Sequence, residues 1–215
     1  SEEYKSSTDY LLVNLENNIL TITLNRPEAL NAYRPEMLVE IREIITQTED
    51  DPNVAVIVIE GAGKAFSAGV DLKVLQGFDP DSGKIGDLFD KPAALAWDTF
   101  RKSRCPIIAK VHGAAYAAGC QLVASCDLAY STRDALFATP GVNFGLFCST
   151  PMVAVSRKIN RKRMMKMLLT GDPIKADYAK KIGLINDHFP ISKLEDEVVN
   201  LAKKIASKSN LTIKI

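Results

Sequence analysis

The stretch Val111-His-Gly-Ala-Ala-Tyr-Ala-Ala-Gly-Cys-Gln-Leu-Val-Ala-Ser-Cys-Asp127 is a turn of small residues that passes directly into an apolar helix. Its small side chains, between Gly113 and Gly119, let a ligand approach the main-chain N–H groups at the helix start. Those free amides and the helix dipole favour an oxygen that carries or develops negative charge. The same residues also suit a close-packed junction between a helix and a strand, so the stretch alone leaves both interpretations open.

The first part of the chain has the pattern of a β-hairpin followed by a helix. Residues 10–16 and 19–24 alternate apolar and polar side chains around Asn17 and Asn18, which tolerate the positive φ of a tight turn. After Pro35, a residue that suits the first turn of a helix, apolar side chains recur at helical spacing. The chain is therefore predicted to open on β structure.

The continuous apolar run 54–59 has the length and β-branched content of a strand buried on both faces, and residues 107–111 are predicted as a second strand. Each precedes a small-residue loop and a helix, and a polar, glycine-containing segment at 76–90 resembles a mobile surface loop ahead of a helix at 92–102. Further helical patterns occupy residues 152–158, 161–169, 175–181 and 192–208. The sequence therefore predicts an α/β fold of repeating ββα or βα units in one domain that covers residues 1–215.

Composition and charge exclude several classes of function. With 47% hydrophobic residues the chain can form one large core, and 27 Lys and Arg against 26 Asp and Glu give no basic surface for nucleic acid. No segment reaches the roughly 18 consecutive apolar residues of a membrane span, and the N-terminus lacks the apolar region of a secretory signal. No Cys-x-x-Cys pair indicates a metal site. We therefore expect an intracellular protein, in the cytoplasm or, after removal of a presequence, in the mitochondrial matrix.

Three segments occur in a specific order: Asn25-Arg-Pro-Glu-Ala-Leu-Asn-Ala32, Ala65-Phe-Ser-Ala-Gly-Val-Asp-Leu-Lys73 and the stretch 111–127. Together they resemble the crotonase family, that is, the enoyl-CoA hydratases and isomerases, and segments 117–127 and 137–151 carry the most detailed match. The resemblance implies a spiral core of ββα repeats with two sheets near right angles, here residues 1–190. It also implies a helical C-terminal region, of which 191–215 would be a shortened start, and homotrimers or dimers of trimers.

The resemblance also implies an acyl-CoA ligand, with coenzyme A as part of the substrate and no separate, tightly bound cofactor or metal. Its shared chemistry is an oxyanion hole, in which two backbone N–H groups polarise a thioester carbonyl and stabilise the enolate that follows. By position in the motifs, these amides belong to Val70 and Ala118.

The first loop of the family also contacts coenzyme A. Main-chain groups that hold the CoA adenine map to Ala68 and Leu72, and Asp71 and Lys73 match the family's Asp and Lys positions. Lys73 would lie near the CoA phosphates, although a Lys after a loop is just as often a surface charge. Ala117 and Ala118 stand where hydratases commonly have Gly-Gly, which preserves the amides and narrows the approach to them.

The sequence departs from the family where hydration needs its acids. Hydration requires one group that activates water and one that delivers a proton, and family hydratases use two glutamates. Their positions map to Gln121, whose carboxamide cannot take a proton near neutral pH, and to Gly141, which has no side chain. A third position, where some relatives have a catalytic aspartate, lies near Ser149. Ordinary hydration is therefore not expected, which leaves another acyl-CoA reaction (thioester hydrolysis, isomerisation or decarboxylation) or non-catalytic acyl-CoA binding.

The remaining polar and aromatic residues near these motifs are interpreted mainly as structural. His112 either orders the turn before Gly113 or touches the ligand. His188 is expected to be structural, and Trp97 is expected to anchor the core rather than line an acyl pocket. The four cysteines are expected to be buried and structural, and they are Cys105, Cys120, Cys126 and Cys148.

Overall fold

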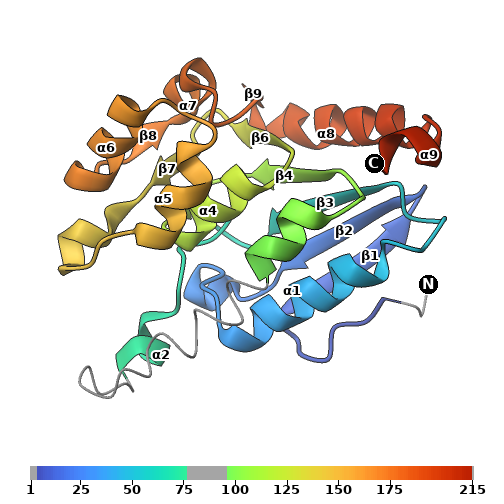
Figure 1. Cartoon of the computed structure of the whole chain (residues 1–215), viewed down its shortest axis with the longest axis horizontal. Coiled ribbons are helices and arrows are strands. Elements are labelled where there is room, and N and C mark those ends of the chain that lie inside the picture. The colour runs from blue at the N-terminus through green and yellow to red at the C-terminus, as the bar shows by residue number, and fades with distance from the viewer. Residues whose placement is uncertain (1–3, 77–95, 215) are drawn as a thin grey trace.

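The larger of two sheets in this computed structural model, which describes residues 4–76 and 96–214, has the strand order β1-β2-β3-β4-β6-β9 (Figure 1). Within it β1 and β2 are antiparallel, and the other neighbouring strands are parallel. A sheet of mainly parallel strands confirms the predicted α/β class. Its strands are β1 (Leu11–Glu16), β2 (Ile19–Leu24), β3 (Val56–Gly61), β4 (Ile107–Val111), β6 (Leu128–Thr132) and β9 (Asp187–Phe189).

The predicted hairpin is formed by β1 and β2. Asn17 and Asn18 have φ angles of 53° and 62°, and Glu16 pairs with Ile19 across the turn. Asparagine enters this left-handed region more easily than most residues because its short polar side chain bonds locally. The two asparagines therefore allow the tight reversal that sets the register of the hairpin.

Helices cover both faces of the larger sheet. On β3, Ile57 packs in the main apolar cluster, which also contains residues of α1 (Pro35–Gln47). Val56, one position earlier, packs in a second cluster with residues of α8 (Ile191–Ala206). Because successive strand residues point to opposite faces, a strand covered on both sides has no polar positions. This explains the unbroken apolar run at 54–59.

A smaller sheet joins β5 (Ala114–Tyr116), β7 (Leu136–Ala138) and β8 (Ile174–Lys175), in the order β5-β7-β8. The prediction that the stretch 111–127 passes directly from a turn into a helix is wrong here, because β5 precedes α4 (Ala118–Ser125). A strand of only three residues, whose partner β7 is distant in sequence, is too short to show the alternation that could reveal it.

The helical predictions for the last third of the chain are confirmed, with ends that differ by a few residues. The expected loop at 76–90 lies outside the described residues except for its first position, and the expected helix at 92–102 is described from residue 96. The other elements are η1 (Pro27–Ala29), α2 (Leu72–Gln76), η3 (Pro140–Phe144), α5 (Ser149–Ser156), α6 (Arg161–Thr170), α7 (Ala176–Ile182) and α9 (Asn210–Ile213).

Candidate functional site

Asn31 holds the loop that follows β3 in place. Its Nδ2 donates to the carbonyls of Ala62 and Ala65, both at 2.8 Å, and its Oδ1 accepts the Arg26 N–H at 2.8 Å. The Ser67 hydroxyl donates to the Asn31 carbonyl at 2.9 Å. Because the Asn31 side chain is buried and uses both of its polar atoms, it fixes the loop where water would otherwise solvate it.

Backbone hydrogen bonds join this loop to the stretch 111–127. The Ser67 N–H donates to the Ala114 carbonyl at 3.0 Å, and the Tyr116 N–H donates to the Ser67 carbonyl at 2.9 Å. A Cβ on Gly119 would lie 2.3 Å from the Ser67 carbonyl oxygen, so a larger residue at this position would separate the two segments. The small residues therefore allow close packing of a loop against the start of a helix. This is the second of the two interpretations that the sequence of this stretch left open.

Ala117 makes the turn into α4 with an unfavourable backbone conformation, φ 50° and ψ −116°. Its N–H donates to the Ala138 carbonyl of β7 at 2.9 Å, so the smaller sheet holds the turn. An L-residue with a Cβ adopts this conformation at a cost of about 1–3 kcal/mol. Such strain, next to the first amide of a helix, is typical of a functional site.

Gly69 brings the amides of Val70 and Ala118 together. It has a φ of 98°, and a Cβ built on it would lie 3.3 Å from the Ala118 nitrogen and 2.9 Å from the Ala117 Cβ. Its carbonyl accepts the Tyr33 N–H at 2.6 Å, which fixes the peptide that leads to Val70. Within the described residues, neither the Val70 nor the Ala118 N–H has an acceptor. The two segments therefore place two amide donors without an acceptor beside Gly69, and their role as an oxyanion hole stays a prediction.

Both amides border an apolar cavity of about 560 Å³. Phe144 and Phe147 line it while remaining 67% and 45% exposed, so part of its wall is open to solvent. Ala68 and Leu72, the predicted adenine contacts, line the same cavity as Val70 and Ala118. A cavity with apolar walls and a few converging amides suits the acyl part of a ligand that carries one polarised carbonyl.

Gly141, the position of the second glutamate, has no room for a side chain. A Cβ there would lie 2.9 Å from the Leu146 carbonyl oxygen and 3.0 Å from the Cys148 Sγ. The Gly141 N–H donates to that sulfur at 3.3 Å and its carbonyl accepts the Leu146 N–H at 2.9 Å. The Cys148 sulfur thus occupies the space that a glutamate would need. Burial raises the pKa of the Cys148 thiol, so the thiol stays neutral near pH 7.

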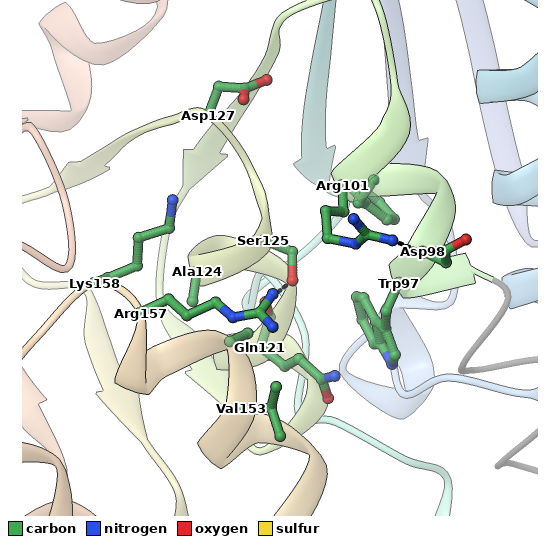
Figure 2. A pocket seen from close by; sticks show the side chains of 12 residues that line it. Trp97, Asp98, Arg101, Gln121, Ala124, Ser125, Asp127, Val153, Arg157 and Lys158 are labelled. Carbon is green, nitrogen blue, oxygen red and sulfur yellow. Dashed lines mark hydrogen bonds and ion pairs between the residues drawn. The ribbon is translucent and has the colours of Figure 1, made fainter. Parts of the chain in front are cut away.

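Gln121, the position of the first glutamate, contributes to a different cavity of about 370 Å³, here called the Gln121 cavity (Figure 2). Figure 2 shows its side chain pointing toward Trp97 and Val153. The residue is 4% exposed, and its Oε1 has no hydrogen-bond partner among the described residues. Both positions were assigned to the family's catalytic glutamates, which would act on one substrate. In the described structure, however, Gln121 and Gly141 line different cavities.

Asp71 and Lys73, the other predicted CoA contacts, differ in how freely they can meet a ligand. The Asp71 carboxylate is 7% exposed, bonds Arg26 at 2.9 Å and accepts the Lys73 N–H at 3.0 Å. Burial alone would raise the Asp71 pKa, but these partners outweigh it and lower that pKa. Asp71 therefore orders the end of the loop, whereas Lys73 is exposed and free to reach a phosphate.

The remaining candidates have structural environments. His112 Nε2 bonds the Gly63 carbonyl at 2.8 Å, which supports the interpretation that it orders the turn. Trp97 packs against the main apolar cluster and also lines the Gln121 cavity. Burial raises the pKa of the Cys120 thiol to about 12. Ser149 is exposed at the start of α5, where it lines the apolar cavity.

The described residues contain neither a cluster of metal-binding side chains nor a helix suited to cross a membrane. No group of three or more His, Cys, Asp or Glu side chains in residues 4–76 and 96–214 could hold a metal ion. Within the same ranges, no helix combines the length and apolarity needed to cross a membrane. The expected absence of a metal and of a tightly bound cofactor stays a prediction.

Asn31, which fixes the loop after β3, was not among the residues predicted for the site, although it lies in the segment 25–32 that carries the family resemblance. The signal was available, because Asn is a residue that adopts positive φ and bonds local backbone groups, and Asn31 has a φ of 54°. The strain at Ala117 had no such signal, since alanine rarely adopts this conformation.

Known proteins resemble this chain over nearly all of its length. Residues 14–215 match the family described as enoyl-CoA hydratase/isomerase. Enoyl-CoA hydratase domain-containing protein 3, mitochondrial, from Danio rerio is 40% identical over 97% of this chain and 72% of its own length. The protein of the same name from Rattus norvegicus is 42% identical over 92% of this chain and 65% of its own length. The chain thus spans about two thirds of the length of these relatives.

Solved structures agree with these relatives. A crystal structure of enoyl-CoA hydratase from Mycobacterium smegmatis has a TM-score of 0.91 and 42% identity, and covers 95% of this chain and 79% of its own. That of human enoyl Coenzyme A hydratase domain-containing protein 3 also has a TM-score of 0.91, with 38% identity, and covers 95% of this chain and 80% of its own. The expected fold of the family is thereby confirmed.

Proposed function

Because the chain belongs to the enoyl-CoA hydratase/isomerase family, we propose that it binds an acyl-CoA thioester with the carbonyl oxygen between the Val70 and Ala118 amides. The observation that carries this proposal is the meeting of these two amides, both without an acceptor in the described structure, at the wall of an apolar cavity. The acyl chain occupies the cavity, and the CoA part runs over Ala68, Leu72 and Lys73.

The pair of amides supplies an oxyanion hole. Two N–H groups that are fixed before the ligand arrives polarise the thioester carbonyl and stabilise the negative charge of an enolate. One such donor contributes on the order of 3 kcal/mol to a transition state. Gly69 and Ala117 position the two donors through backbone conformations with positive φ and not through side chains. This pair of amides, here called the amide cradle, therefore does not depend on the protonation of any residue.

Ordinary hydration of an enoyl-CoA is expected to be slow. At position 121 a carboxamide replaces the water-activating acid, and at position 141 the Cys148 sulfur fills the place of the proton donor. Neither replacement group changes its protonation near pH 7, because an amide does not titrate and the pKa of the buried thiol is raised. The site can therefore stabilise an enolate without the usual means of adding water.

The test is to measure crotonyl-CoA binding by calorimetry and its hydration by loss of enoyl absorbance on the same protein. We expect saturable binding with little or no hydration. Turnover comparable with that of an active hydratase would overturn the interpretation of positions 121 and 141. Absence of binding by crotonyl-CoA and by longer acyl-CoAs would overturn the oxyanion hole itself.

A second candidate function is non-catalytic acyl-CoA binding, which the packing of Cys148 against Gly141 favours. Other reactions of an enolate or thioester, namely hydrolysis, isomerisation and decarboxylation, need a different base. Product analysis with saturated, enoyl and carboxyacyl thioesters separates these reactions from pure binding.

We also propose that the protein forms a homotrimer or a dimer of trimers, and that it is located in the cytoplasm or in mitochondria. The names of the relatives include the word mitochondrial.

A further inference from the structure

The Gln121 cavity carries positive charge that the described chain does not neutralise. Arg101, Arg157 and Lys158 line it together with Asp98 and Asp127. Asp98 is already paired with Arg101 and with Lys102. The Asp127 carboxylate accepts the Ile107 N–H at 2.8 Å. Within residues 4–76 and 96–214, neither Arg157 nor Lys158 forms an ion pair.

A buried carboxamide points into this basic space. Figure 2 shows the Gln121 side chain entering the cavity between Arg157 and Trp97, with Arg101 on the side of Trp97. Its Oε1 is buried and has no partner in the part of the chain that the structure describes. A buried polar atom without a partner costs about 1–3 kcal/mol, so a polar ligand group at this place would relieve it. Rotation of the amide lets it present either its N–H or its carbonyl.

Two helices connect this cavity with the apolar cavity that borders the Val70 and Ala118 amides. On α4, Ala118 lines the apolar cavity, and Gln121 and Ser125 line the Gln121 cavity. Positions 118, 121 and 125 share one helix face, because three and four residues complete about one turn. Thr150 of α5 lines the apolar cavity, and Arg157, the helical C-cap residue directly after α5, lines the Gln121 cavity seven positions later on the same face.

The spacing sets the length of a ligand that would reach both places. Ala118 and Ser125 are seven positions apart, which corresponds to roughly 10 Å along the helix. An extended chain advances roughly 1.2 Å per bond, so an acyl chain needs about eight bonds to reach from the height of Ala118 to that of Ser125. A medium-length acyl chain that starts at the cradle would therefore end beside the unpaired cations.

We propose that the ligand is an ω-carboxyacyl-CoA of medium length, with its thioester in the amide cradle and its far carboxylate at Arg157, Lys158 and Arg101. This proposal rests on the proposed function and names its substrate class. The chain passes along the shared face of α4 and α5, and the Gln121 carboxamide donates to the carboxylate. Arginine suits this role because its planar guanidinium binds a carboxylate with two parallel hydrogen bonds.

The experiment compares suberyl-CoA, an ω-carboxyacyl thioester, with octanoyl-CoA, which has the same chain without the carboxylate. Trp97 is the only tryptophan of the chain and lines the cavity, so its fluorescence reports binding, and calorimetry gives the Kd. We expect suberyl-CoA to bind about tenfold more tightly, since a charge-assisted hydrogen bond at a partly exposed site contributes about that factor. Arg157→Gln is expected to abolish this preference and leave the octanoyl-CoA Kd unchanged.

The matched control is Arg133→Gln, which removes the same charge at an exposed position that lines neither cavity. It should retain the tenfold preference. The proposal is overturned if the two thioesters bind equally, if the preference survives both Arg157→Gln and the double variant with Lys158→Gln, or if free suberate binds as tightly as suberyl-CoA. Octanoyl-CoA that binds without any preference defeats this proposal alone, whereas failure of every thioester to bind defeats the proposed function as well.

Discussion

Replacing Gly69 by alanine tests the cradle directly. The new methyl group would lie 2.9 Å from the Ala117 Cβ, 2.9 Å from the Tyr116 carbonyl oxygen and 3.3 Å from the Ala118 nitrogen. All three atoms belong to residues 116–118, which run from the end of β5 into α4, and none is the flexible end of a side chain. The loops must therefore move apart, which separates the Val70 and Ala118 amides.

The loss of folding stability expected for Gly69→Ala has two parts. At a φ of 98°, alanine pays at least the left-handed penalty of about 1–2 kcal/mol. Forcing a methyl group into a packed site adds about 1–3 kcal/mol. Together the two parts destabilise the protein by roughly 3 kcal/mol, which for a chain of this size lowers the melting temperature by about 10 °C. Acyl-CoA affinity is expected to fall in addition, because separated amides cannot share one oxygen.

Gly145→Ala is the matched control. Gly145 also has a positive φ, 72°, but a Cβ there meets nothing within 4 Å. It should therefore lose only the backbone part, about 1 kcal/mol. The measurements are urea unfolding of both variants and calorimetric titration with octanoyl-CoA. If Gly69→Ala is no less stable than Gly145→Ala and binds octanoyl-CoA with wild-type affinity, the amides do not form a cradle at this junction.

Three further predictions concern neighbouring residues. Ala117→Gly should stabilise the protein by about 1 kcal/mol in urea unfolding while acyl-CoA binding persists, because glycine accepts the conformation that strains alanine. Asp71→Asn should cost roughly 3 kcal/mol above pH 5, since it leaves Arg26 buried without its carboxylate. The pKa of Asp71 is lowered in the folded state, so the stabilisation by its carboxylate is present above the unfolded pKa of about 3.9 and is lost as the pH falls through the folded pKa. If the difference in stability between wild type and Asp71→Asn does not shrink in acid, the prediction is wrong. Gly141→Glu should lower stability by about 2 kcal/mol without raising crotonyl-CoA hydration, and Cys148→Ala in the same chain should restore part of the stability.

Local signals in the sequence were sufficient for much of the fold. The Asn17-Asn18 turn and the apolar run of β3 predict their elements because the responsible interactions lie within a few residues or involve simple burial. The strands of the smaller sheet gave no such signal. Their stability comes from pairing between segments distant in sequence, such as Ala115 with Phe137, and strands of two or three residues are too short to show a periodicity.

The same distinction applies to the site. The pairing of the Val70 and Ala118 amides was predicted from the family resemblance, and in the described structure both amides lack an acceptor and border one cavity. The direction of the Gln121 side chain depends on how α4 packs against α5 and residues 96–102, which a motif does not encode. The spacing of residues also could not predict that the Gly141 N–H bonds the Cys148 sulfur, because this contact depends on how the loop between the two residues folds.

Gln121 and Gly141, the two positions that the family resemblance assigns to catalytic acids, differ in whether the surrounding structure would accept an acid. At position 121 a carboxamide has the same shape as glutamate, so the surrounding structure would accept the acid. A carboxyl there would be buried, and the nearby Arg157 and Arg101 would decide whether it ionises. At position 141 the loop has closed on Cys148, and an acid would have to displace the sulfur and the Leu146 carbonyl. Restoring the first acid therefore leaves enolate stabilisation without a proton donor. Hydration would require rebuilding the loop from Gly141 to Cys148 as a unit.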